Sequence, residues 1–178
     1  MKNMDGYYDF SGQKFGYPLS LSINGFSQNV FVRQSSLELS YVLQGSYEAV
    51  TEHFSETVKA GELVIIAPYD IHMLSKRQGE ESGMILTIHI DFSRMAESMA
   101  GNPRESFRSG IFTMAQNKEV YFALKRKIGE LVKMLMEDKS NLLHLNVLMA
   151  ELAFLAASPG ALAMEELPLQ SEHQENYM

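Results

Sequence analysis

Hydrophobic and polar residues alternate along much of residues 18–112, which is the pattern of strands with one face in a core. The stretch PLSLSINGF alternates in this way, and NVFVR, LELSYVLQ, SYEAVTEHF, ELVIIA and MILTIHIDF follow at short intervals. Between these runs stand turn-forming residues such as Gly45, Gly61 and Pro68. Because many short strands occur with no helical segment among them, the pattern predicts an antiparallel sandwich or barrel.

From about Asn117 the apolar positions adopt the period of a helix. They recur at spacings of three and four, with charged residues between them, at Val120, Leu124, Ile128, Leu131 and Leu135. Gly129 inside this segment lowers helix propensity by about 1 kcal/mol relative to alanine, so packing must hold the helix. The pattern predicts one amphipathic helix packed against the barrel.

A second helix is predicted between Asn141, a capping residue, and the helix-stopping sequence that begins at Ser158. Its main apolar stripe consists of Leu145, Leu148, Leu152 and Leu155. Further apolar residues, among them Val147 and Phe154, make the helix apolar on more than one side. Such a helix needs two neighbours. We expect one to be the barrel or the preceding helix, and the other to be a second protomer that contacts the leucine stripe in a homodimer.

These patterns divide the chain into four parts: an amino-terminal arm (1–17), a barrel (18–115), a two-helix dimerisation segment (116–158) and a linker (159–178). The arm carries several aromatic residues, including Tyr7, Tyr8 and Phe10, which either cover a ligand or pad the outside of the barrel. The last segment contains four glutamates and two prolines, the composition of a linker.

Composition restricts the class of protein further. The 178 residues have a formal net charge of −7, so the chain lacks the cationic surplus that draws proteins to nucleic acids. It has no cysteine, which excludes disulfides and thiolate chemistry. The amino terminus lacks the features of a signal peptide, and no apolar run is long enough to span a bilayer, so we expect a cytoplasmic protein without a membrane partner.

The sequence lacks the common signatures of hydrolases, zinc proteases and nucleotide-binding enzymes. What remains are two short motifs: six residues separate Glu38 from Gly45, and six separate Gly61 from Pro68, with His72 beyond. At these positions the chain resembles the cupin superfamily. LELSYVLQGSYEAV, AGELVIIAPYDIHML and MILTIHIDFSR together resemble the amino-terminal sensing and dimerisation domain of AraC-type transcription regulators. The resemblance implies a cupin-like antiparallel β-barrel, or jelly roll, followed by two C-terminal helices.

The resemblance also bears on metal binding. Metal-binding cupins supply a His-x-His pair shortly before the glutamate, whereas this chain has Val32 and Gln34, or Phe31 and Arg33, at those positions. Because transition-metal sites need three or more imidazole or carboxylate ligands, we expect no metal and no cofactor. The alternative is a stand-alone metal-dependent cupin enzyme, an isomerase or a dioxygenase, and a third possibility is a structural dimer with a vestigial pocket.

By resemblance to the sugar-sensing members of the family, the ligand-binding candidates are Arg33, His72, Thr87, His89, Glu38 and Tyr41. Strand alternation places Thr87 and His89 on one face, but it separates Glu38 from Tyr41 unless a bulge intervenes. Each candidate has a structural alternative: His72 can bond a nearby backbone group, His89 can pair with a neighbouring strand, and Arg33 can be a surface cation.

The function expected from the resemblance is non-enzymatic. The chain is predicted to bind a small polar effector, such as a sugar, inside the barrel. It is predicted to form a homodimer and to act on DNA only through a C-terminal domain that this chain does not contain.

Overall fold

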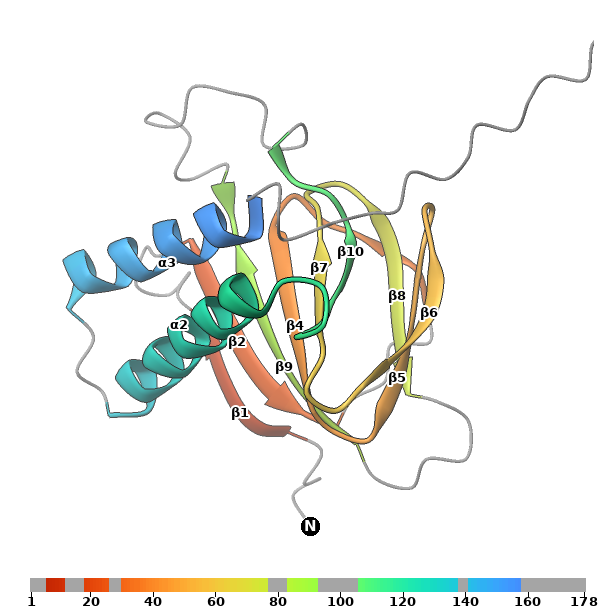
Figure 1. Cartoon of the computed structure of the whole chain (residues 1–178). Coiled ribbons are helices and arrows are strands. Elements are labelled where there is room, and N and C mark those ends of the chain that lie inside the picture. The colour runs from red at the N-terminus through yellow and green to blue at the C-terminus, as the bar shows by residue number, and fades with distance from the viewer. Residues whose placement is uncertain are drawn as a thin grey trace, which may run out of the picture.

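The computed structural model describes residues 6–11, 18–25, 30–76, 83–92, 106–137 and 141–157. Within them, two antiparallel sheets face one another, and two helices cover the outer face of the larger sheet (Figure 1). The larger sheet has the order β1 (Gly6–Ser11), β2 (Leu19–Asn24), β9 (Met84–Ile90), β4 (Leu37–Gln44), β7 (Leu63–Ile66) and β10 (Gly110–Phe112). The smaller sheet has the order β3 (Val32–Arg33), β8 (Ile71–Lys76), β5 (Ser46–Thr51) and β6 (Ser55–Lys59). The predicted fold class, an antiparallel β architecture followed by two C-terminal helices, is confirmed.

Strand alternation divides the apolar residues between two cores. On β4, Leu37 and Leu39 pack toward the helices, while Val42 packs between the sheets. On β9, Ile88 faces the helices and Ile85 faces the smaller sheet. The larger sheet is therefore buried on both faces, which is why its central strands are more apolar than the strands of a half-exposed sheet.

Helix α2 (Lys118–Met136) begins at Asn117, whose side-chain oxygen accepts a hydrogen bond from the Val120 amide at 3.1 Å. Its buried stripe contains the predicted residues except Val120, which is only partly buried. Tyr121 and Met134 are buried in addition. The Tyr121 hydroxyl donates to the backbone carbonyl of Gly61, which ties the helix to the turn before β7. The cap therefore fixes where α2 begins, and the buried stripe and the Tyr121 hydrogen bond hold the helix against the larger sheet.

Helix α3 (Leu142–Ala157) is apolar on two opposite sides, as the sequence predicts. However, Leu145, Leu148 and Leu152 are fully buried within the chain and Leu155 is half-buried in the same core. The first three side chains have no surface left for a second protomer, which corrects their assignment to a dimer interface. The exposed apolar side chains are those of Leu142, Leu143, Val147 and Phe154.

Residues 6–11, assigned from the sequence to an arm, form the edge strand β1, which pairs with β2. Phe10 is half-buried and packs against the core that lies between the larger sheet and the helices. It therefore pads the outer face of the sheet and does not cover the space between the sheets. The rest of the predicted arm and the predicted linker lie outside the described residues.

Neither helix in the described part of the chain combines the length and the apolar character needed to cross a membrane.

Candidate functional site

A band of polar side chains crosses the inner face of the larger sheet, where a core would ordinarily be apolar. Register places Ser20 of β2 beside His89 of β9, and His89 beside Glu38 of β4. The next inner row contains Ser22, Thr87 and Ser40. Buried polar groups are costly unless they are hydrogen-bonded, so three adjacent strands that place such residues inward define a site rather than a simple core.

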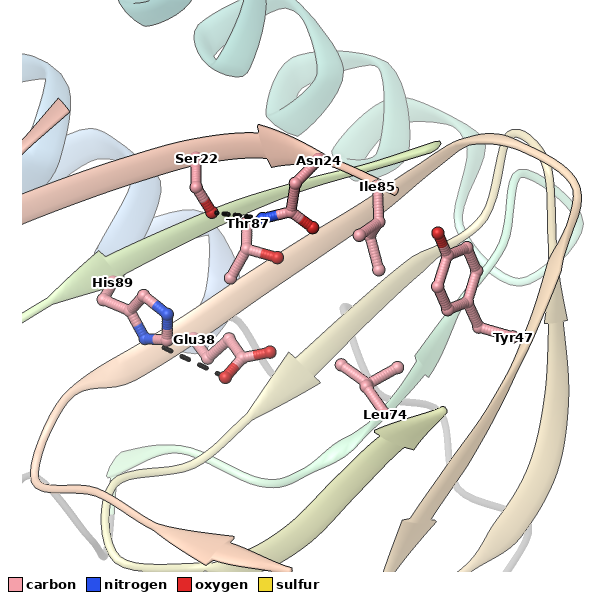
Figure 2. A pocket seen from close by; sticks show the side chains of 8 residues that line it. All are labelled: Ser22, Asn24, Glu38, Tyr47, Leu74, Ile85, Thr87 and His89. Carbon is pink, nitrogen blue, oxygen red and sulfur yellow. Dashed lines mark hydrogen bonds and ion pairs between the residues drawn. The ribbon is translucent and has the colours of Figure 1, made fainter. Parts of the chain in front are cut away.

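A cavity of about 100 Å³ opens on this band, and we refer to it as the first cavity. Figure 2 shows its polar side chains gathered at one end and its apolar side chains at the other. The polar lining is Ser22, Asn24, Glu38, Thr87 and His89, and the rest is Tyr47, Leu74 and Ile85. The amide of Asn24 donates to the Ser22 hydroxyl at 3.2 Å, which orients both groups beside the cavity.

Glu38 is the centre of the hydrogen-bond network. Its side chain is almost fully buried; Oε1 accepts from the Ser40 hydroxyl at 2.7 Å, and Oε2 accepts from the Gln34 amide at 2.7 Å and faces His72 Nε2 at 3.1 Å. The Ser40 hydroxyl also lies 3.0 Å from that of Thr87, which extends the network across β9. Both carboxylate oxygens are therefore satisfied by protein donors.

His72 is the cationic partner of Glu38. Its Nδ1 lies 3.2 Å from the backbone carbonyl of Asp70, an acceptor only, and its Nε2 faces a carboxylate. Both ring nitrogens therefore carry protons. Burial lowers the pKa of His72, but the hydrogen bond and the charge of Glu38 outweigh burial and raise it. Burial likewise raises the pKa of Glu38, but the hydrogen bond from His72, the nearby imidazoles and Ser40 outweigh it and lower the pKa to about 2.

His89 behaves differently from His72, although its Nδ1 lies only 3.8 Å from Glu38 Oε2 and 3.4 Å from the Ser36 hydroxyl. Burial lowers its pKa, and the attraction of Glu38, opposed by the charge of His72, does not restore it. With 30% of its side chain exposed, His89 presents a neutral imidazole at neutral pH. Such a ring can both donate and accept a hydrogen bond.

The structure brings together four of the six predicted ligand residues, namely Glu38, His72, Thr87 and His89, but not the other two. Arg33 is exposed on β3, where its Nε donates to the backbone carbonyl of Tyr69 at 3.0 Å, so the surface-cation alternative is the one observed. Tyr41 lies on the opposite face of β4 and packs toward α2, because three positions along a strand reverse the face.

Sequence reasoning missed four polar members of the site: Ser22, Asn24, Gln34 and Ser40. The alternation of LSLSIN and LELS carries the periodic signal, but polar alternate positions ordinarily face solvent. The Gln34 amide donates to Glu38 Oε2 at 2.7 Å, which makes Gln34 a member of the network around this carboxylate. His72 makes both the local backbone bond and the bond to Glu38, so its two predicted roles are compatible.

Glu38, His72 and His89 are the metal-ligating residue types at this site. Within the described ranges, no group of three or more His, Asp and Glu side chains is arranged to hold a metal ion. Glu38 and His72 direct their polar atoms at each other at 3.1 Å, and the third candidate ligand atom, His89 Nδ1, lies 3.8 Å from the same Glu38 oxygen and 3.4 Å from the Ser36 hydroxyl.

A second cavity, of about 260 Å³, lies along the same strands and shares His89 with the first. Its lining consists of Pro18, Leu19, Ser20, Gln34, Ser35, Ser36, His89 and Asp91. His89 therefore separates two spaces that are both lined largely by neutral hydrogen-bonding groups.

No protein-family model matches the chain, and no curated protein matches it. Solved structures that resemble it in part include oxalate decarboxylase from Bacillus subtilis, at 17% identity and a TM-score of 0.42 over 49% of this chain and 26% of that one. Ethanolamine utilization protein Q from Salmonella typhimurium matches at 18% identity and a TM-score of 0.39 over 47% of this chain and 66% of that one. The chain thus spans about a quarter of the length of oxalate decarboxylase, and these likenesses concern the fold alone.

Proposed function

We propose that this chain is the effector-binding and dimerisation part of an AraC-type transcription regulator, and that it binds a small neutral polyhydroxy molecule, a sugar, between its two sheets. The observation that carries the proposal is the first cavity, whose hydroxyl, amide, carboxylate and imidazole groups converge from β2, β4 and β9. Converging polar groups beside an apolar wall are the usual composition of a small-molecule site.

The charges around the cavity favour a neutral ligand. Glu38 is balanced by His72, whose protons point at Glu38 and at a backbone carbonyl and not at the cavity. Arg33, the one cation among the predicted ligand residues that carries a permanent charge, is exposed and donates to the backbone carbonyl of Tyr69. An anionic ligand would therefore meet the carboxylate of Glu38 without a compensating cation, whereas hydroxyl groups can pair with serine, threonine, asparagine and the neutral His89.

The strands that line the first cavity also pack against the helices. On β2 and β9, Ser22 and Thr87 point to the cavity, while their neighbours Leu21 and Ile88 pack in the core shared with α2 and α3. A ligand that favours one position of these strands thereby favours one position of the helices. In a regulator, that displacement would alter the arrangement of two DNA-binding domains, neither of which is in this chain.

The homodimer that the proposal needs has a surface on α3 opposite its buried side. The outward stripe consists of Leu143, Val147 and Phe154, spaced by four and seven residues, with Leu143 at 72% and Phe154 at 74% exposure. Exposed apolar residues at this spacing form one continuous helical face. Such a face fits the same face of a second copy across a two-fold axis.

The ligand-binding part is tested by thermal shift of the chain against a panel of neutral sugars and small organic acids, with and without chelator. A sugar should raise the melting temperature in a chelator-insensitive manner, because a ligand that prefers the folded state stabilises it. Thr87→Val should abolish the shift. Thr57→Val should retain it, because Thr57 lies outside the cavity, on the face of β6 opposite to the buried Val58. Stabilisation by a divalent metal alone, or an equal shift in both variants, would contradict the proposal.

The dimer is tested by sedimentation equilibrium. Val147→Glu and Phe154→Glu should shift the chain toward monomer while the circular dichroism spectrum stays that of the folded protein, whereas a matched exposed substitution on the other helix, Phe122→Glu, should leave the dimer intact. Both sets of variants sedimenting alike would exclude this face as the interface.

A further inference from the structure

The two cavities lie on one continuous polar surface. Ser20, Ser22 and Asn24 alternate along β2, and Thr87 and His89 alternate along β9, with Ser20 opposite His89 and Ser22 opposite Thr87. The first cavity is lined by Ser22, Asn24 and Thr87, and the second by Ser20, with His89 common to both. Two residues along a strand advance by about 7 Å. Hydrogen-bonding groups therefore lie on both sides of the His89 imidazole along this surface.

The volumes indicate that a ligand uses both spaces. The first cavity, at about 100 Å³, is well below the roughly 300 Å³ at which small-molecule sites begin. The second holds about 260 Å³, and the two together reach that range. A ligand that filled the first cavity alone would leave the larger, equally polar space to water.

The two cavities offer similar groups, and each has one carboxylate in its lining, Glu38 in the first and Asp91 in the second. The second contains the hydroxyl groups of Ser20, Ser35 and Ser36 and the amide of Gln34, which resemble the serine, threonine and asparagine groups of the first. The cationic side chains of lysine and arginine are lacking from both linings within the described residues, so neither cavity is built for a phosphate or a carboxylate. Repeated neutral donors and acceptors match repeated hydroxyl groups.

Building on the proposed function, we propose that the effector is a two-unit polyhydroxy molecule of the disaccharide class, with one unit in each cavity and its linking atom beside His89. The half-buried imidazole is the residue that touches both units. Its neutral ring can donate to, or accept from, groups on either side. His89 thus sets the length of the ligand that the site accepts.

The test uses maltose, cellobiose and lactose against glucose and galactose, with binding measured by isothermal titration calorimetry. The matched variants are Ser20→Val and Ser22→Val, which sit two residues apart on the same face of β2 and block the second and the first cavity respectively. Ser20→Ala and Ser22→Ala serve where a valine impairs folding, as judged by circular dichroism of the unliganded protein.

We expect at least one disaccharide to bind at least tenfold more tightly than its component monosaccharide. Ser22→Val should weaken both, and Ser20→Val should weaken the disaccharide at least tenfold more than the monosaccharide. Equal affinities for the two sizes, or a disaccharide that ignores Ser20→Val, would overturn this inference and leave the single-sugar site intact. Binding of none of these sugars would overturn the proposed effector class itself.

Discussion

The buried pair of Glu38 and His72 allows a sharp prediction, because its two members differ in whether they can lose their charge. Glu38→Gln removes the carboxylate, and His72 can then release its Nε2 proton and accept a hydrogen bond from the glutamine amide while Nδ1 still donates to Asp70. His72→Asn keeps an amide donor near the position of Nδ1 but removes the proton directed at Glu38. It leaves the carboxylate buried with donors from Gln34 and Ser40 alone.

The magnitude follows from the pKa of Glu38. Its ordinary value of 4.5 falls to about 2 in the folded chain, and each unit corresponds to about 1.4 kcal/mol, so the surroundings favour the ionised carboxyl by on the order of 3 kcal/mol. Removing one partner of a buried pair costs a similar amount, about 3–5 kcal/mol. We therefore expect His72→Asn to lower the free energy of unfolding at pH 7 by about 3 kcal/mol and Glu38→Gln by about 1 kcal/mol.

The pH dependence has two limbs of opposite sign. Because the pKa of Glu38 is lowered, its contribution is present above pH 4.5 and is lost as the pH falls from 4.5 toward about 2. Because the pKa of His72 is raised above 6.5, its contribution is complete below pH 6.5 and is lost as the pH rises through the raised value. In Glu38→Gln, the free energy of unfolding should therefore no longer show the fall between pH 4.5 and about 2 that this carboxyl causes.

Urea denaturation followed by far-ultraviolet circular dichroism at pH 3, 5 and 7 measures these quantities for the wild type, the two single variants and the double variant. The double variant should be more stable than His72→Asn by at least about 1 kcal/mol, because it no longer contains an unpaired buried charge. A loss below 1 kcal/mol for His72→Asn, or strictly additive losses in the double variant, would refute the reasoning.

Three further substitutions test local features by the same denaturation assay. Gly129→Ala should raise the free energy of unfolding by about 0.5–1 kcal/mol, since a Cβ at this exposed helical position meets no atom within 4 Å; a destabilised variant would contradict that packing. Asn117→Ala should lower it by about 1 kcal/mol through loss of the cap on the Val120 amide, and Asn117→Asp should restore it. Ser109→Ala should lower it by about 1–3 kcal/mol, because the buried carboxylate of Asp70 and a backbone amide lose their hydroxyl partner; an unchanged value would show that water replaces it.

The fold could be predicted because each element has its own period. Alternation located most of the strands, though not β1, which was assigned to an arm, or β8; spacings of three and four located α2 and α3, and Asn117 marked the start of α2. What alternation does not reveal is which polar face is covered by a second sheet. Ser22 and Ser40 belong to strands with polar and apolar faces like those of any solvent-exposed sheet, and only the packing of the smaller sheet turns their polar face inward.

The site and the interface were predictable only in part for related reasons. Arg33 is close to Glu38 in sequence, but β3 belongs to the smaller sheet. The Arg33 side chain therefore contacts Tyr69 and does not reach the site around Glu38. On α3, both faces are apolar, and the helical period identifies two stripes without saying which one meets α2. The leucine stripe at Leu148 proved to be the inner one, and Phe154 marks the outer one.

The central position of β9 has a consequence for how the chain folds. β9 lies between β2 and β4, so Leu19 and Leu37 both pair with Ile90, one on each side of it. During synthesis the hairpin of β1 and β2 emerges early, yet one of its edges stays open until residue 90 has left the ribosome. Pairings between distant segments are the slow ones, because the intervening chain must first be closed into a loop. Insertion of β9 is thus the step that joins β2 to β4 and brings together the polar groups of the proposed ligand surface.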